Sequence, residues 1–279
     1  MVYDRPIFDP DEWGLTSEQK QLCEETRKLA EKNFLSRSVK YDSNASFPVE
    51  NYKDLHQANL MGICIPKIYG GKGADLKTYM LAAAEIGRYC GATALTFNMH
   101  VSSCLWTGYL ADNIDMDRGK RQEHESMRAN HYERILNEGS IYAQPFSEGN
   151  ASAAGHKAFA TKAVIADGGW IVNGKKIFAS LSGHADYYGV LCTELNDENS
   201  KPKRSNTIYL AIPSKSKGVS VEGEWDPLGM RGTISRNLIF KDVYIPFKEQ
   251  LMPRGIYYKA VKTWPHMFMT LTPSYVGIA

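Results

Sequence analysis

The residue types best suited to chemistry lie within residues 142–183, in two short motifs. Residues 147–152 are a run of small and polar residues that follows a short apolar segment. Such a run lets the backbone approach a ligand closely and offers free N–H groups and hydroxyls. Further on, Phe178 precedes Ser180 by two residues, which places both side chains on one face of a strand. An aromatic ring and a hydroxyl beside such a loop would suit a flat ligand that forms hydrogen bonds.

The same pattern is also typical of an ordinary strand, with Phe178 in the core and Ser180 in solvent. The dipeptide Asn173-Gly174 follows the apolar residues 170–172 and is suited to a two-residue type I′ turn. We therefore expect a β-hairpin with its turn at this dipeptide and a returning strand over residues 175–180.

Length and composition restrict the class of protein. A chain of 279 residues exceeds one typical domain and favours two folding units. The 33 basic and 31 acidic residues nearly cancel, which favours neither nucleic acid nor a membrane surface as a partner. The five cysteines are widely spaced without a Cys-x-x-Cys pair, as is typical of reduced, mostly buried thiols. No signal peptide is apparent, so we expect a cytoplasmic protein, or a mitochondrial matrix protein in a eukaryote.

Helices are predicted before residue 140. Thr16 and Gln19 have the spacing of a capping box, so a first helix should begin at Thr16. Pro48 should open a second helix that stops at Gly62, and Asp75 should cap a third. Each of these helices has apolar residues at helical spacing, so each should pack one face on a core.

Residues 91–111 contain no charged residue, yet they are too polar for a membrane span. We expect a buried central helix, which would offer Asn98, His100 and Trp106 as candidate wall residues of a ligand tunnel. His100 is better explained as a hydrogen-bonded core residue.

Residues 115–138 are strongly charged and predict a helix that ends at Gly139. His124 and His131 lie two turns apart on it, too far for one zinc ion without a ligand between them, so we expect a solvated helical face. Five further runs have the length and composition of strands: residues 187–193, 207–212, 219–225, 237–240 and 243–246. The order of elements lacks the βαβ alternation of a Rossmann domain, and the chain becomes helical again from about Ile256.

This order of elements resembles the acyl-CoA dehydrogenase family over most of the chain, from about Leu15 to Ala279. Residues 143–152 (AQPFSEGNAS) resemble that family's first flavin-contact segment. Residues 173–180 (NGKKIFAS) resemble its Asn-Gly-x-Lys-x-Trp-Ile-Thr motif. Two further segments resemble the end of its β domain: residues 229–233 (GMRGT) and 240–246 (FKDVYIP).

The resemblance implies an α+β fold in three parts. Residues 1–139 would form an N-terminal all-helical domain. Residues 140–250 would form a β-sandwich or β-barrel domain with the flavin and acyl-CoA cleft. Residues 251–279 would be the start of a truncated C-terminal helical bundle.

The resemblance also implies FAD as cofactor and an acyl-CoA thioester as substrate, dehydrogenated between its α and β carbons with hydride transfer to FAD. The residues implied at the flavin are Gln144, Phe146, Ser147, Phe178, Ala179 and Ser180. Ser147 and Ser180 replace threonines of the family pattern, and Phe178 replaces a tryptophan. Ser152 is the implied substrate contact, with Ala153 as an alternative because the spacing needs a one-residue shift. Asn98 is a second candidate substrate contact.

The chain also departs from the family. The family's catalytic base is a Glu of the C-terminal bundle, which we expect beyond Ala279, so no catalytic residue is assigned. Pro265 and Phe268 replace an Asp and an Arg that contact CoA, and Glu148 takes the place of a structural acid. Because the sequence ends inside an apolar helix, we expect a piece of a longer protein, inactive alone, rather than a natural short form.

Two alternatives to a dehydrogenase stay open: a flavin-dependent monooxygenase on the same fold, and a non-catalytic subunit that keeps the fold. For a dehydrogenase, the resemblance implies electron-transfer flavoprotein or a similar acceptor as partner, and a homo-oligomer in the full-length form.

Overall fold

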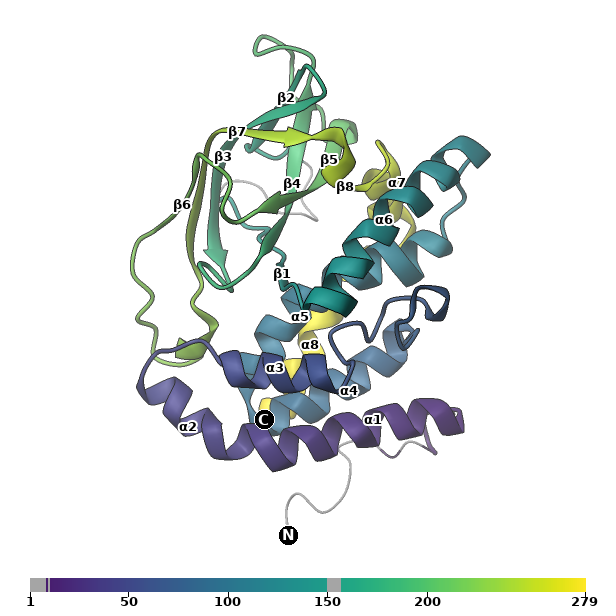
Figure 1. Cartoon of the computed structure of the whole chain (residues 1–279), viewed down its shortest axis with the longest axis vertical. Coiled ribbons are helices and arrows are strands. Elements are labelled where there is room, and N and C mark those ends of the chain that lie inside the picture. Colours follow the sequence, from purple (N-terminus) through teal and green to yellow (C-terminus); the bar gives the residue numbers. More distant parts are fainter. Residues whose placement is uncertain (1–8, 10, 150–156) are drawn as a thin grey trace.

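The structure is a computed structural model that describes residue 9, residues 11–149 and residues 157–279. Helices come first and strands follow, as the sequence predicts, and a helical segment then returns to the first helices (Figure 1). The first group of helices is α1 (Ser17–Leu29), α2 (Leu35–Ser43), α3 (Val49–Gln57), α4 (Leu76–Tyr89), α5 (Gly91–Leu105) and α6 (Arg118–Glu138). The last helical elements are α7 (Ile256–Thr263), a 3₁₀ segment (Pro265–Leu271) and α8 (Thr272–Ile278), which packs on α4 and α5.

The helix starts agree with the predicted caps. Thr16 accepts a hydrogen bond from the Gln19 backbone while the Gln19 side chain accepts one from Thr16, so the capping box is confirmed. The Asp75 carboxylate accepts the Thr78 N–H and caps α4.

The predicted stop at Gly62 is wrong. Helix α3 ends at Gln57, and Asn59 then adopts a left-handed φ of 53° that turns the chain. Gly62 serves close packing instead, because a Cβ atom there would lie 2.4 Å from the Leu136 side chain of α6. In the sequence alone, a glycine required for close packing, such as Gly62, cannot be distinguished from a glycine that ends a helix.

The uncharged helix is buried at the centre of the molecule, as predicted. Helix α5 continues into a π-helical segment (Trp106–Leu110), and nearly every residue from Thr93 onward is buried. Within the part of the chain that the structure describes, no helix combines the length and apolarity needed to cross a bilayer.

Helix α6 begins after Asp117 and ends at Gly139, which has the left-handed φ of 69° expected of a C-terminal glycine. The predicted solvated face is wrong for its two histidines, because His124 and His131 are both buried. His124 bonds to the Thr107 carbonyl and His131 to the Tyr142 hydroxyl, so they join α6 to its neighbours. The many charged residues of this helix led to the prediction of a solvated face, although one face packs against the core.

The strands form one mixed sheet in the order β6-β7-β3-β2-β4-β5-β8, with β1 also pairing with β4 (Figure 1). The pairs β1–β4 and β2–β4 are parallel, and the others are antiparallel. The strand bounds are β1 (Tyr142–Ala143), β2 (Lys162–Ala166), β3 (Gly169–Ala179), β4 (Tyr187–Leu195), β5 (Thr207–Pro213), β6 (Val219–Glu222), β7 (Arg236–Pro246) and β8 (Gln250–Met252). The two predicted runs at 237–240 and 243–246 merge into the single strand β7.

The predicted hairpin turn at Asn173-Gly174 is wrong. Strand β3 runs through this dipeptide, and the turn lies at Asp167-Gly168, between Ala166 of β2 and its partner Gly169. At Asn173 the pairing of β3 with β7 shifts register in a β-bulge. Both dipeptides suit a tight turn, and only the pairing partners decide which one makes it.

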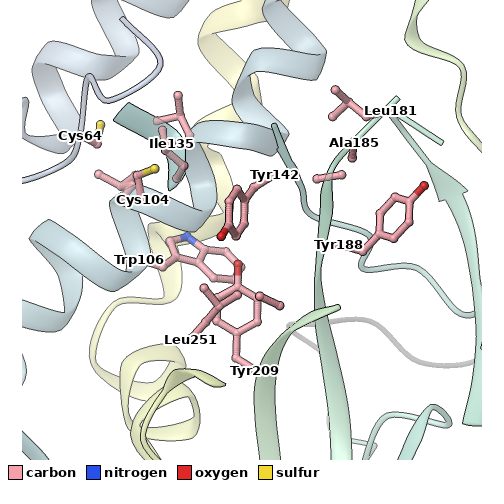
Figure 2. Packing of buried hydrophobic residues seen from close by; sticks show 14 of the residues in the cluster. Cys64, Cys104, Trp106, Ile135, Tyr142, Leu181, Ala185, Tyr188, Tyr209 and Leu251 are labelled. Carbon is pink, nitrogen blue, oxygen red and sulfur yellow. The ribbon is translucent and has the colours of Figure 1, made fainter. Parts of the chain in front are cut away.

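One hydrophobic core joins the helices to the sheet. Figure 2 shows Trp106 of the π-helical segment close to Tyr142 of β1 and Tyr209 of β5. All five cysteines are free and buried, as predicted.

Candidate functional site

A cavity of about 350 Å³ lies where helix, sheet and C-terminal elements meet. Its walls come from α5, the segment after β1, the end of β3, the β6–β7 connection and the region of α8. The lining residues are Leu95, Met99, Gln144, Phe146, Ser147, Phe178, Ser180, Trp225, Pro227, Gly229, Met230, Thr233, Ser235, Leu271 and Tyr275. The cavity therefore gathers five of the six residues predicted for a flavin.

Phe178 and Ser180 both line this cavity, but for a different reason from the predicted alternation along a strand. Phe178 has a φ of 51° at a second register shift between β3 and β7, and β3 ends at Ala179. The Phe178 side chain is 66% exposed, whereas Ser180 is 8% exposed. The alternative of a core Phe and a solvated Ser is therefore reversed at both positions.

Gln144, Phe146 and Ser147 also line the cavity. The Gln144 amide donates to the Gly189 carbonyl (2.9 Å) and accepts a hydrogen bond from the Tyr209 hydroxyl. Phe146 packs against Trp106, with ring centroids 5.1 Å apart. The Ser147 carbonyl accepts the N–H of Ile177 (2.8 Å), which fastens this loop to β3.

A buried ion pair joins two residues that lie close to this lining in the sequence. The Glu148 carboxylate is 2.6 Å from the Lys176 ammonium, and both side chains are fully buried. Glu148 also accepts the N–H groups of Ala160 and Thr161, and Lys176 donates to the Leu191 carbonyl. Burial alone would raise the pKa of Glu148, but the adjacent ammonium keeps it below its usual value. The pair links the residue after Ser147 to a residue two before Phe178, as a structural acid would.

Three hydroxyls form a chain along the cavity wall. The Ser180 and Ser235 oxygens are 2.8 Å apart, as are those of Ser235 and Thr233, and Thr233 donates to the Met230 carbonyl at 2.9 Å. Neither Ser235 nor Thr233 is among the site residues predicted from the sequence. Thr233 lies in the segment 229–233, whose resemblance to the family motif could have indicated a residue near the site.

The other predicted site residues lie elsewhere. Ala179 is buried and does not line the cavity. Asn98 is buried and accepts a hydrogen bond from Tyr79 (2.9 Å), while Leu95 and Met99 of the same helix reach the cavity. Ser152 and its alternative Ala153 fall outside the described residues.

His100 is a hydrogen-bonded core residue, as predicted. Its Nε2 atom bonds to the Met61 carbonyl (2.9 Å) and its Nδ1 atom accepts the Tyr142 N–H (3.0 Å). Burial lowers its pKa to about 4, so the ring is neutral at physiological pH.

The lining favours binding and orientation of a flat ring. Among the described residues that line the cavity there is no carboxylate, imidazole or amine. They offer aromatic faces, thioethers, one amide and hydroxyls, which can stack on a ring and bond to its polar edge. The described residues also contain no cluster of three or more His, Cys, Asp or Glu that could hold a metal ion.

Two family matches cover most of the helices and the sheet. Residues 16–111 match the acyl-CoA dehydrogenase N-terminal domain, and residues 145–243 match the acyl-CoA dehydrogenase middle domain. The chain belongs to the acyl-CoA dehydrogenase family. The predicted family and the α+β fold class are thereby confirmed.

Individual members of the acyl-CoA dehydrogenase family are distant from this chain. The short-chain specific acyl-CoA dehydrogenase of Clostridium acetobutylicum is 27% identical over 269 residues, which are 96% of this chain and 65% of that protein. The mitochondrial isovaleryl-CoA dehydrogenase of Arabidopsis thaliana is 27% identical over 241 residues, 85% of this chain and 54% of that protein. The chain thus spans just over half to about 65% of the length of these relatives.

Solved structures show the same fold. The butyryl-CoA dehydrogenase of Megasphaera elsdenii superimposes with a TM-score of 0.74 at 22% identity, over 94% of this chain and 66% of that one. The dibenzothiophene monooxygenase of a Paenibacillus species superimposes with a TM-score of 0.70 at 23% identity, over 92% and 62%. At such identities the similarity concerns the fold alone.

Proposed function

We propose that this chain provides the flavin-ring site of a flavoprotein that dehydrogenates an acyl-CoA thioester between its α and β carbons. The observation that carries the proposal is the convergence of Phe178, Ser180, Gln144 and Ser147 on one cavity in a member of this family. These residues come from two segments, residues 144–147 and 178–180, which the fold brings to one cavity.

The cavity fits a flavin ring on two grounds. A large aromatic side chain, Phe178, is exposed on its wall with a strained backbone, an arrangement typical of a residue that serves a ligand. Ser180 lines the same space, where its hydroxyl can bond to a polar ring atom. Phe178 would support the ring face, and Ser180, Ser147 and Gln144 would hold its polar edge. When bound, the flavin supplies the acceptor for the substrate hydride.

The dehydrogenation also needs a base that removes a proton from the carbon beside the thioester carbonyl. No described cavity residue is a carboxylate, imidazole or amine, and Glu148 is committed to Lys176 and two backbone N–H groups. We therefore place the base outside the described lining and expect the 279-residue chain to be inactive alone.

Further expectations rest on the family resemblance and stay part of this proposal. We expect the flavin to be FAD and the electron acceptor to be electron-transfer flavoprotein or a similar protein. We expect the full-length form to be a homo-oligomer in the cytoplasm or the mitochondrial matrix. We also keep the predicted domain limits at residues 139 and 250. Substrate contacts by Ser152 and Asn98 also stay predictions, and the second gains no support from the burial of Asn98.

Anaerobic reduction of bound FAD tests the proposal. The FAD-loaded chain is mixed with butyryl-CoA, with or without a high concentration of imidazole as an external base. We expect the oxidised flavin absorbance to persist without imidazole and to fall with it, together with formation of the 2-enoyl thioester. Free CoA in place of butyryl-CoA is the control and should give no reduction.

A different outcome would redirect the assignment. Flavin that binds and is reduced by dithionite, but never by any acyl-CoA with external base, contradicts a dehydrogenase. Oxygen uptake by the reduced protein with an aromatic substrate would then support the monooxygenase alternative.

A further inference from the structure

The chain of three hydroxyls restricts what Ser180 can offer to a ligand. Each hydroxyl has one proton, and the Met230 carbonyl can only accept, so Thr233 donates its proton to Met230. The bond between Ser235 and Thr233 must then use the proton of Ser235, and the bond between Ser180 and Ser235 must use that of Ser180. In this arrangement Ser180 presents only lone pairs to the cavity.

The three hydroxyls can also donate their protons in the opposite direction along the chain. If Thr233 donates to Ser235 and Ser235 donates to Ser180, the Ser180 proton is free to point into the cavity. The change removes one hydrogen bond from the Met230 carbonyl. That carbonyl keeps two other donors, the Thr233 backbone N–H (3.1 Å) and the Trp225 indole N–H (3.3 Å). Both directions therefore leave the buried polar groups of the wall bonded.

We infer that Ser235 and Thr233 are positioning residues that let Ser180 act as a donor or as an acceptor, whichever the facing ligand atom requires. This inference rests on the proposed flavin site. An oxidised flavin presents ring nitrogens that accept hydrogen bonds, and reduction places a proton on a nitrogen that then donates. One serine on a reversible hydroxyl chain can serve both redox states without moving its side chain.

Substitution of Thr233 tests the inference because it fixes the direction. In Thr233→Val, Ser180 is the only acceptor for the Ser235 proton that remains among the described residues, so Ser180 is held as a donor. Riboflavin is the probe, since it carries the ring without phosphate groups, and its dissociation constant is measured anaerobically for the oxidised and the dithionite-reduced forms. We expect the ratio of the reduced to the oxidised dissociation constant to rise about three- to tenfold over wild type, the effect of one neutral hydrogen bond.

Two further variants follow from the same proton count. Ser235→Ala breaks the chain and leaves Ser180 free to donate, so the ratio should rise in the same direction. Thr233→Ser restores the hydroxyl and should return the ratio to the wild-type value. These variants keep the test available if Thr233→Val folds poorly.

A matched control lies in the same turn. Ser182 is buried, donates to the Ala179 carbonyl and does not line the cavity, so Ser182→Ala removes a hydroxyl without touching the chain. Its ratio should equal that of wild type.

The outcomes separate this inference from the proposed function. Equal weakening of both forms by Thr233→Val, or an unchanged ratio, overturns the reversible chain and leaves a purely structural role. Absence of saturable riboflavin binding by the wild type overturns both the chain and the flavin site. Failure of acyl-CoA to reduce the flavin, with the predicted ratios intact, contradicts only the dehydrogenase assignment.

Discussion

The side chain of Phe178 lies in an unusual place for a large apolar group. Two thirds of it is exposed, and its left-handed backbone costs about 1–2 kcal/mol in a residue with a Cβ atom. Neither feature stabilises the chain by itself, which is why we relate both to a ligand. The type and spacing of this residue indicated a site residue. The backbone bulge that directs its side chain toward the cavity depends on pairing with β7, so the local sequence does not predict it.

Lys176 is a residue whose importance the sequence conceals. Its charge is fully buried against Glu148, and removing one partner of a buried pair leaves the other charge uncompensated. We predict that Lys176→Met lowers the free energy of unfolding by about 3–5 kcal/mol, measured by urea denaturation. Adding Glu148→Gln should recover part of this loss. Lys259→Met, which removes an exposed ion pair with Asp115, is the control and should change little. A loss as small as that of the control would contradict the buried pair.

At the scale of elements, caps and breaks were predictable to different degrees. Thr16, Asp75 and Gly139 fix helix ends through local hydrogen bonds or local φ angles, so their prediction from the sequence succeeded. The predictions at Gly62 and at Asn173-Gly174 are wrong because the roles of these residues depend on distant segments, namely α6 and β7. Local interactions determine these helix ends, whereas contacts with distant segments determine the role of Gly62 and the position of the hairpin turn.

The bulge opposite Asn173, where β7 carries the extra residue, gives a prediction at this scale. A Cβ atom on Gly174 would lie 2.6 Å from the Thr161 Cα atom, and the bulge is fastened by two hydrogen bonds between Asn173 and Asp242. We expect Gly174→Ala to lower the free energy of unfolding by about 2 kcal/mol or more, because a backbone atom must move. Thermal denaturation measures the effect.

Gly119→Ala provides the comparison. Gly119 lies in α6, where a Cβ atom would meet its nearest neighbour at an ordinary 3.4 Å. Since alanine favours a helix over glycine by about 1 kcal/mol, this variant should be as stable as wild type or more so. Equal destabilisation of both variants would show that steric contact at the bulge is not the cause.

At the scale of the whole molecule, helices and sheet are joined by polar contacts as well as by the core. Arg134 of α6 binds Glu249 through two hydrogen bonds of 2.7 and 2.9 Å, just before β8. His100 bonds to β1 and to the Met61 carbonyl, although it lies within α5. These contacts join residues 39 to 115 positions apart, so no local pattern in the sequence indicates which residues pair.

The neutral His100 predicts a dependence of stability on pH. Its folded pKa of about 4 lies below the value of 6.5 expected when unfolded, so the unfolded chain binds more protons between these values. Stability should therefore fall as the pH decreases from about 6.5 towards 4. In His100→Gln, which cannot titrate, urea unfolding at pH 7 and pH 5 should show a loss smaller by about 1–2 kcal/mol.

Ile68 is exposed and has no titratable group, so Ile68→Ala supplies the control. It should leave the pH dependence as it is in wild type. If His100→Gln also kept the full wild-type pH dependence, the neutral buried imidazole would be contradicted. His124 and His131, whose pKa values burial also lowers to about 4, account for part of the dependence that remains.

Riboflavin binding by the wild-type chain and by Phe178→Ala tests whether this cavity, which is built by α5, the sheet and α8 together, is a flavin-ring site. We predict saturable quenching of riboflavin fluorescence by the wild type and about tenfold weaker binding by Phe178→Ala, from loss of one aromatic contact. The melting temperature should stay the same, since the side chain is mostly exposed. Ile68→Ala removes another exposed apolar side chain and should bind as wild type. No saturable binding, or equal binding by wild type and Phe178→Ala, would contradict a flavin-ring site in this cavity.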